Sequence, residues 1–423
     1  MRIDRLTLKN YKGFASREFN LNPRFNLFVG DNATGKTSIL DALTLAIDSW
    51  FIGMKVGEGI GGIRPHEVRY ATHQYEDSVS FEPQYPSRVE ASGVVMGHTL
   101  SWNRELSKEG GRTTTAGAKE LTAIATEADR KIREKIDVDL PLVCSYGAER
   151  LWYETSHRVR KGNDTAKLRP SRFDGYRDCT AFEIQETALL KWIEAEILIS
   201  QQRGSDTNAL AVIKKASVSC VDDAETIYYD PRVKDLIIVM KRRGHVMFHD
   251  LSAGQRIMVI LIGDLARRAI TLNPHMGRDV LEKTVGIVTI DELDLHLHPK
   301  WQRRVIHDLK QTFPRIQFIA STHSPQLIGE ALPEEIRVLE DWDVSIPERS
   351  FGLDSNRVLQ EVMHAPERNE ETHQLLSELA DKIDKEDLDS AKKIVGQVTK
   401  KLGDGDPEVT GANTLISLLE STQ

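Results

Sequence analysis

The stretch FNLFVGDNATGKTSILDALTLAIDSW, residues 25–50, decides the fold of this chain. It opens with an apolar run, Phe25–Val29, which predicts a buried strand. The run leads directly into GDNATGKT, residues 30–37, which has the form GxxxxGKT, and the next segment has the apolar spacing of an amphipathic helix. This order of strand, glycine-rich turn and helix predicts a phosphate-binding loop, because the turn and the helix N-terminus direct backbone N–H groups at an anion.

Each residue type in this loop has a chemical role toward a nucleoside triphosphate. Lys36 can reach the outer phosphates, and the hydroxyl of Thr37 is a suitable ligand for Mg²⁺. The other residues expected around the phosphates are Gly30, Asn32, Gly35 and Ser38. The sequence therefore predicts ATP and Mg²⁺ as the ligands of the loop.

An acidic pair follows a second apolar run, Gly286–Ile290, that predicts another buried strand. Downstream of a phosphate loop, Asp291 at the end of such a strand is expected to hold the metal through water, and Glu292 to polarise the attacking water. A third run, Ile316–Ala320, leads to His323, which is expected to bond the γ-phosphate or orient the water. The predicted catalytic residues are Glu292, His323 and Lys36.

The segment LSAGQ, Leu251–Gln255, precedes a further apolar helix pattern. Taken alone, it requires no more than Ser252 as the N-cap of that helix. Together, however, the ordered motifs resemble those of the ABC-type ATPases, with Walker A at residues 30–37, the signature at LSAGQ, Walker B at residues 287–292 and the switch histidine at position 323.

This resemblance implies a head-to-tail dimer that encloses ATP between two subunits. The signature of one subunit would close on the phosphates held by the other, so that Ser252 and Gly254 act in trans. Gln255 belongs to the same expected nucleotide-binding set. A homodimer, or a higher oligomer built on such dimers, is therefore expected.

The stretch DLHLHP, residues 294–299, admits two interpretations. Asp294, His296 and His298 could form a metal site. In ABC-type ATPases, however, the segment after the catalytic glutamate is the D-loop at the dimer interface. HLHP after the acidic pair resembles the RecF/OLD branch, with His298 where an aspartate is usual, and we expect His296 and His298 to lie in a D-loop.

The interval between Thr37 and Leu251 is too long for a minimal ATPase lobe, and it lacks the heptad runs of coiled-coil arms. Residues 145–152, 171–177 and 272–326 resemble a bacterial group of RecF-like ATPases in anti-phage defence, notably the ATPase subunits of Septu systems and of retron-linked modules. That resemblance implies a separate effector, an HNH-type nuclease. Ala148-Glu149 depart from the usual small-residue turn, which leaves Arg150 open as a phosphate contact or a structural residue.

The composition indicates a cytoplasmic globular protein with no membrane partner. The chain has 423 residues, 40% hydrophobic and 28% charged, and no apolar run approaches the roughly 18 residues of a membrane helix. Its three cysteines form no CxxC pair. A net charge of -8 argues against coating nucleic acid by bulk charge. The basic residues between Arg150 and Arg177 are either a solvated surface or a contact to DNA.

The expected fold class is α/β: an ABC-type P-loop ATPase head with a mixed sheet, a largely helical insertion and a helical C-terminal region. We assign residues 1–140 to an ATPase lobe with Walker A and antiparallel strands, and 141–248 to a mostly helical insertion. Residues 249–345 would carry the signature, Walker B and the switch histidine, and 346–423 the helical tail. The apolar stripes of the tail predict self-packing or docking on the ATPase lobe, or alternatively a surface for a partner. No nuclease domain is expected in this chain.

Three functions remain open from the sequence. The favoured one is an ATPase that regulates a separate effector nuclease in anti-phage defence. The second is a RecF-like DNA-repair ATPase that clamps duplex DNA when ATP is bound. The third is an ATP-binding scaffold that hydrolyses little.

Overall fold

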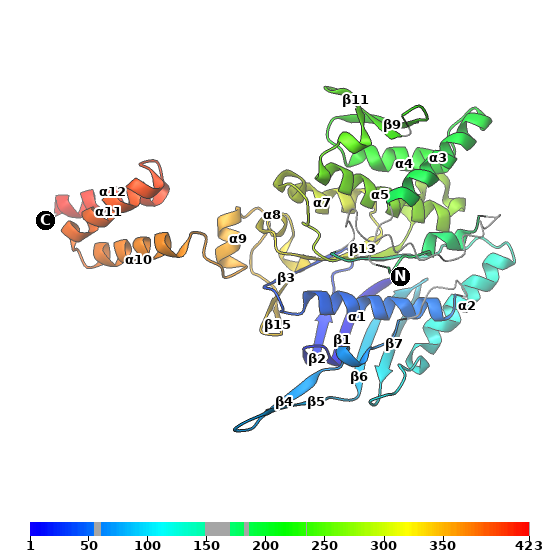
Figure 1. Ribbon diagram of the computed structural model, residues 1–423, viewed down its shortest axis with the longest axis horizontal. Helices are drawn as coiled ribbons and strands as arrows, with labels where there is room; N and C mark the ends of the chain where they lie inside the picture. The colour runs from blue at the N-terminus through cyan, green and yellow to red at the C-terminus, as the bar shows by residue number, and fades with distance from the viewer. Residues whose placement is uncertain (55–60, 149–169, 182–185, 234, 423) are drawn as a thin grey trace. The chain divides into compact units, whose positions relative to one another are not determined.

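A computed structural model describes residues 1–423 except 55–60, 149–169, 182–185, 234 and 423 (Figure 1). The chain divides into two compact units, Met1–Leu353 and Asp354–Gln423. The boundary lies beyond residue 346, where the helical tail was expected to begin. The segment up to Leu353 stays with the first unit because Gly352 donates its N–H to the carbonyl of Gly329 at 2.9 Å and Ser350 donates its hydroxyl to that of Ala331 at 2.7 Å.

The first unit contains a six-stranded mixed sheet in the order β15-β14-β3-β13-β12-β8. All neighbouring pairs are parallel except β14 and β15, which form an antiparallel hairpin. The strands are β3 (Phe25–Gly30), β8 (Leu142–Tyr146), β12 (Gly286–Ile290), β13 (Ile316–Thr322), β14 (Ile336–Glu340) and β15 (Asp343–Ser345). Parallel pairing brings the carboxyl ends of β3, β12 and β13 to one edge, as in open α/β sheets that bind ligands there.

A second sheet is antiparallel, in the order β2-β1-β6-β7. Its strands are β1 (Arg2–Tyr11), β2 (Phe14–Asn20), β6 (Ser87–Val95) and β7 (His98–Leu106). Helix α1 (Lys36–Asp48) contacts strands of both sheets, so most of its side chains from Ile39 onward are buried. The indole of Trp102 on β7 donates to the carbonyl of Ala46 on α1 at 2.9 Å. The helix that follows the phosphate loop is thus fixed on both sides.

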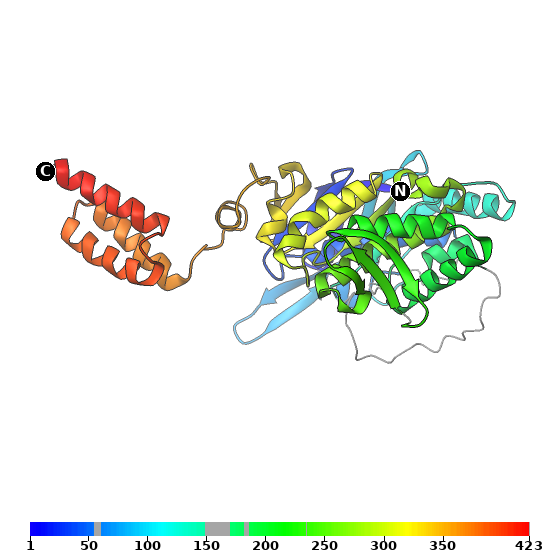
Figure 2. The same cartoon turned by 90° about the horizontal axis from the view of Figure 1, so that it is seen from above.

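The remaining elements of the first unit surround these sheets. The β4–β5 hairpin (Tyr70–Gln74 and Val79–Pro83) projects from the unit in both views (Figures 1 and 2). A three-stranded sheet, in the order β11-β10-β9, was not expected from the sequence. It is formed by β9 (Ala224–Asp230), β10 (Asp235–Met240) and β11 (Gly244–Met247). The helices are α2 (Lys119–Arg133), α3 (Glu186–Arg203), α4 (Asn208–Ser219), α5 (Ala253–Leu272), α6 (Val280–Lys283), α7 (Pro299–Thr312) and α8 (Pro325–Ile328).

These findings confirm an α/β fold with a mixed sheet and a helical C-terminal region. The segment 141–248 also differs from the mostly helical insertion that was expected. It holds α3 and α4, but β8 at its start pairs with β12 and is the edge strand of the central sheet. The ATPase sheet therefore continues into the segment that was assigned to the insertion.

The second unit consists of α9 (Ser355–Glu361), α10 (Glu370–Asp384), α11 (Leu388–Leu402) and α12 (Pro407–Thr422). Helices α10, α11 and α12 share a core of their own. Its buried residues are Leu379, Ala391, Ile394, Val395, Val398, Val409, Ala412 and Ile416. The apolar stripes of the tail therefore pack on one another. None of the helices within the described residues is long and apolar enough to cross a lipid bilayer.

Candidate active site

The phosphate loop connects the end of β3 to the start of α1 and requires glycine at both of its ends. Gly30 has a φ of 150° and Gly35 a φ of 101°, a region that L side chains rarely adopt. A Cβ on Gly30 would lie 2.4 Å from the carbonyl oxygen of Leu339, and one on Gly35 would lie 2.8 Å from the ring of Phe14. Asn32 is exposed on the loop.

Lys36 folds back over this loop. Its ammonium group donates to the carbonyl oxygens of Gly30 at 2.8 Å and of Asp31 at 2.7 Å. Burial lowers the pKa of Lys36, while nearby carboxylates, Asp291 foremost, act in the opposite direction. The ammonium group of Lys36 thus donates hydrogen bonds to neutral carbonyl oxygens, and charged phosphate oxygens would be stronger partners for it.

Thr37 and Asp291 meet at the sheet edge. The Thr37 hydroxyl donates to one carboxylate oxygen of Asp291 at 3.0 Å, and the hydroxyl of Ser321, from the end of β13, donates to the other. The N–H of Asp291 donates to the carbonyl of Tyr146 on β8 at 2.8 Å. The carboxylate is therefore oriented by α1 and β13, and the backbone of Asp291 is held by β8. Its oxygens and the Thr37 hydroxyl are oxygen donors, which suit Mg²⁺.

Glu292 lies at the turn that follows β12, with a left-handed φ of 49°. Its N–H donates to the hydroxyl of Ser321 at 2.7 Å, and the N–H of Leu293 donates to the carbonyl of the same serine at 2.9 Å. A side chain in this backbone region costs on the order of 1 kcal/mol and persists where the surroundings enforce it. Ser321 enforces it here, and so it positions both residues of the acidic pair.

His323 is linked to the acidic turn through Asp294. The Asp294 carboxylate accepts hydrogen bonds from the hydroxyl of Thr322 and, at 3.4 Å, from the N–H of His323. Gln302 on α7 donates to the carbonyl of Leu297 at 2.9 Å and accepts from the hydroxyl of Ser324 at 2.7 Å. The two turns after β12 and β13 therefore form one connected structure, with His323 half-buried in it.

The residues of DLHLHP, 294–299, form part of this turn structure. His298 is the N-cap of α7, where its Nδ1 accepts from the N–H of Lys300 at 3.3 Å, and His296 adopts a φ of 63° in the turn before it. Asp294 is engaged with β13, as described above. Within the described part of the chain, no three His, Cys, Asp or Glu side chains are grouped so that they could hold a metal ion.

The signature LSAGQ forms the start of α5. The hydroxyl of Ser252 accepts from the N–H of Gln255 at 3.4 Å, and the Gln255 side chain accepts from the N–H of Ser252 at 3.2 Å, which is a capping box. A Cβ on Gly254 would lie 3.4 Å from the carbonyl oxygen of His296 and 3.5 Å from the nitrogen of His298. The signature and the expected D-loop thus lie side by side in one chain, and the Ser252 side chain is exposed.

A buried charge cluster, not anticipated from the sequence, joins α5 to β8. Asp264 accepts from the Tyr146 hydroxyl at 2.8 Å, from Arg268 at 2.7 Å and from Arg267 at 2.6 Å. Burial alone raises the pKa of Asp264, but Arg268 and Arg267 outweigh it and lower the pKa to about 2. Since the carbonyl of Tyr146 also binds Asp291, this cluster connects the signature helix to the acidic strand end.

The structure brings the three predicted catalytic residues together and leaves the signature residues, predicted to bind nucleotide, apart from them. Lys36, Thr37, Asp291, Glu292 and His323 surround one sheet edge, and Ser38 lies in the first turn of α1. The signature residues instead lie with the D-loop. Ser321 and Gln302 are the contributors that were missed; the only sequence signal for Ser321 was its position at a strand end beside His323.

The basic residues Arg150, Arg158, Arg160, Lys161, Lys167 and Arg169 lie outside the described residues. Two others of that segment have structural partners. Arg172 donates to the carbonyls of Leu272 at 2.7 Å and Val138, and Arg177 pairs with Asp174 at 3.1 Å. These two arginines thus hold the chain to α5 and to its own turn.

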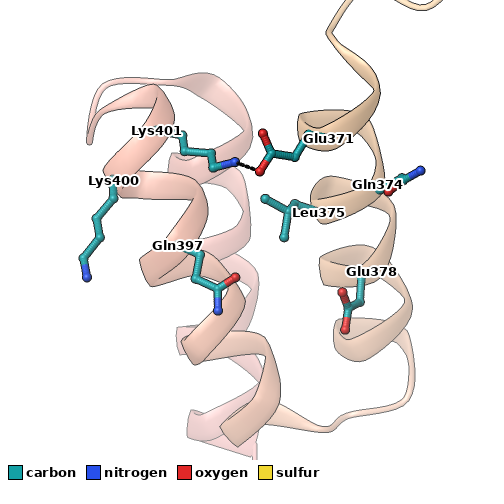
Figure 3. A pocket seen from close by; sticks show the side chains of 7 residues that line it. All are labelled: Glu371, Gln374, Leu375, Glu378, Gln397, Lys400 and Lys401. Carbon is teal, nitrogen blue, oxygen red and sulfur yellow. Dashed lines mark ion pairs between the residues drawn. The ribbon is translucent and has the colours of Figure 1, made fainter.

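A separate cavity of about 430 Å³ lies in the second unit, between α10 and α11 (Figure 3). Glu371 from α10 faces Lys401 from α11, and the two pair across the cavity. Its lining is Glu371, Gln374, Leu375, Glu378, Gln397, Lys400 and Lys401. It contains none of the residues predicted to bind nucleotide.

Comparisons with known proteins agree with the phosphate-loop chemistry. The family model described as AAA domain matches residues 5–216, and a second AAA-domain model matches residues 224–329. The "Retron Ec83 probable ATPase" of Escherichia coli is 25% identical over 473 aligned residues, which cover 96% of this chain and 85% of the relative. The Septu protein PtuA of Bacillus thuringiensis is 25% identical over 378 residues, covering 85% of this chain and 84% of the relative.

The chain also has more distant similarities. The DNA replication and repair protein RecF of Leptospira interrogans is 24% identical over 284 residues, covering 63% of this chain and 71% of the relative. Among solved structures, the SMC head domain from Thermotoga maritima matches with a TM-score of 0.46 and 16% identity, covering 80% of this chain and 94% of that chain.

Proposed function

This chain belongs to the AAA-domain family, and we propose that it is a cytoplasmic ATPase of anti-phage defence that controls a separate effector. One observation carries the ATPase part of the proposal. The Walker A hydroxyl of Thr37 and the hydroxyl of Ser321 hold the two carboxylate oxygens of Asp291, which orients that acid at the mouth of the phosphate loop. The defence part is supported by the retron and Septu relatives, which align along most of the chain.

In this proposal the loop binds the triphosphate of ATP. Lys36 exchanges its bonds to the carbonyls of Gly30 and Asp31 for bonds to phosphate oxygens, and Ser38 and the loop N–H groups bind further phosphate oxygens. Thr37 and Asp291 would hold Mg²⁺, because their hydroxyl and carboxylate oxygens suit this ion. When bound, it would supply positive charge against the phosphates.

Hydrolysis would depend on Glu292 and His323. Glu292 polarises the attacking water as its hydrogen-bond acceptor, and its backbone is fixed for that role by Ser321. His323 lies at the end of the adjacent strand, where it bonds the γ-phosphate or orients the water. Both side chains project from turns that Asp294 connects, so their relative position is set before ATP binds.

We propose that two copies complete each site, head to tail. Ser252 is exposed at the N-terminus of α5, a helix of 20 residues whose positive dipole end suits the γ-phosphate held by a partner subunit. Gly254 lies against the segment of His296 and His298, so the signature and the D-loop would enter the dimer interface as one surface. Gln255 stabilises the backbone conformation of the signature through the capping box.

The effector in this proposal is a separate protein, an HNH-type nuclease. The test is a pull-down of the tagged chain expressed from its native operon, with bound proteins identified by mass spectrometry. A stoichiometric nuclease is the expected result. Recovery of an active ATPase with no partner would contradict the regulatory role.

The phosphate-loop assignment has its own test. Lys36→Ala removes the ammonium that the loop holds at its centre, so nucleotide binding should be abolished. Lys300→Ala, which removes a lysine of α7, is the matched control and should bind ATP like the wild type. Retained ATP binding by the Lys36 variant would contradict the assignment.

A RecF-like DNA clamp is the second candidate, favoured by the similarity to the RecF protein over 63% of this chain. It requires binding of duplex DNA that depends on ATP and weakens steeply with salt, because phosphate contacts release counterions. A filter-binding or anisotropy titration with and without ATP distinguishes it from the effector proposal. An affinity for DNA that is the same with and without ATP would exclude the clamp function.

A further inference from the structure

Trp342, in the turn between β14 and β15, lies against Gly35 of the phosphate loop. A Cβ on Gly13 would come within 2.0 Å of its indole ring, and a Cβ on Gly35 within 2.9 Å. Its ring meets that of Phe14 edge-on, with the ring centroids 5.1 Å apart. The tryptophan nevertheless keeps 38% of its surface exposed. An indole supported on the loop glycine but open to solvent is available to a ligand of that loop.

The turn that carries Trp342 adopts a strained conformation to present this side chain. Asp341 has a φ of 45° and Trp342 a φ of 66°, although neither is glycine. Two-residue hairpin turns with both φ values positive normally take Asn-Gly or a similar pair, because a bulky side chain is disfavoured there. The ion pair of Arg17 and Asp343, at 3.0 Å, ties the hairpin to β2. A hairpin turn of this type does not require tryptophan at this position.

The sheet order determines which end of a nucleotide would lie near this indole. Strand β3 has β13 and then β12 on one side, and β14 on the other. Thr37, Asp291 and Ser321 meet on the β12–β13 side, which is where the outer phosphates and Mg²⁺ are proposed to lie. Leu339 on β14 pairs with Gly30, so the turn after β14 lies at the same edge of the sheet. A triphosphate with its outer end toward β12 directs its nucleoside toward β14 and Trp342.

We propose that the indole of Trp342 is the stacking surface for the purine base of the bound nucleotide. This inference rests on the proposed ATP site, which it extends from the phosphates to the base. Stacking on an aromatic ring adds affinity for the base and none for the phosphates. The role of Trp342 is therefore separable from that of the loop itself.

The test compares ATP with inorganic triphosphate, both with Mg²⁺, in calorimetric titrations of the full chain carrying Glu292→Gln to prevent turnover. Adding Trp342→Ala should raise the Kd for ATP by about ten-fold and leave the Kd for triphosphate unchanged. Trp342→Phe keeps an aromatic face and should retain most of the ATP affinity. Phe351→Ala, which removes a side chain of another exposed aromatic residue, is the control and should change neither.

Fluorescence gives a second readout. ATP should quench emission in the chain with Trp342, triphosphate should not, and Trp342→Phe should lose the quench. Equal weakening of both ligands by Trp342→Ala would show that the indole only supports the loop, and an unchanged ATP affinity would place the base elsewhere; either overturns the inference. If Lys36→Ala fails to weaken triphosphate binding, the proposed ATP site itself is wrong.

Discussion

At the scale of single residues, the Ser321 hydroxyl contacts both members of the acidic pair. Its hydroxyl donates to the Asp291 carboxylate and accepts from the N–H of Glu292, so one side chain orients both acids. The hydroxyl comes from a neighbouring strand, β13, and its position depends on the parallel register in which Ile290 pairs with Ala320.

Replacing Ser321 by alanine should therefore impair turnover more than binding. We expect kcat to fall by about ten-fold or more, because misplacement of a catalytic group costs rate, while the Kd for ATP changes little. Ser350→Ala removes a buried hydroxyl that bonds only a backbone carbonyl of another loop, and it serves as the control. Steady-state kinetics beside equilibrium binding provide the comparison; a Kd that rises as much as kcat falls would refute the positioning role.

At the scale of elements, the buried cluster at Asp264 couples helix α5 to strand β8. Asp264→Asn would leave Arg268, itself 4% exposed, without its counterion. Breaking a buried ion pair from one side typically costs about 3–5 kcal/mol of unfolding free energy. Asp279→Asn, which breaks an exposed pair with Lys283, should cost less than about 1 kcal/mol. Denaturant titrations measure both costs, and equal costs would contradict a stabilising role for the buried ion pair.

The same cluster predicts a pH dependence. The pKa of Asp264 is about 2 in the folded chain, below the value of about 3.9 for an unfolded aspartate. A lowered pKa stabilises the fold above the unfolded value, and that stabilisation is lost as the pH falls toward the folded value. The gap in unfolding free energy between wild type and Asp264→Asn should thus be constant at neutral pH and narrow below about pH 4. A gap that widens in acid would be inconsistent with this assignment.

The elements differ in how far they could be predicted. The phosphate loop, the acidic pair and the signature helix are each contiguous in sequence, and the spacing of glycine, apolar and acidic residues was sufficient to place them. The sheet β9–β11 was missed because β10 (DLIIVM) is an almost continuous apolar run, which periodicity does not distinguish from a helix segment. The contacts of Ser321, Asp264 and Trp342 depend on which strands and helices become neighbours, and local patterns do not specify that.

At the scale of the whole molecule, the chain holds two units with separate cores. Every residue of the proposed nucleotide site lies within Met1–Leu353, and the helices α10–α12 share buried residues of their own. A chain ending at Leu353 should therefore fold and bind ATP with unchanged Kd, and residues 354–423 alone should unfold cooperatively as a helical domain. Circular dichroism and ATP titration check this; loss of ATP affinity on truncation would mean that the second unit contributes to the site.

Whether Glu292 drives hydrolysis in an ATP-bound dimer is tested by light scattering of Glu292→Gln with ATP and Mg²⁺, beside a turnover assay. We expect the variant to bind ATP, to hydrolyse almost none and to accumulate as a dimer that the nucleotide-free protein does not form. Turnover equal to that of the wild type would remove Glu292 from the chemistry, and the chain would then be better described as an ATP-binding scaffold.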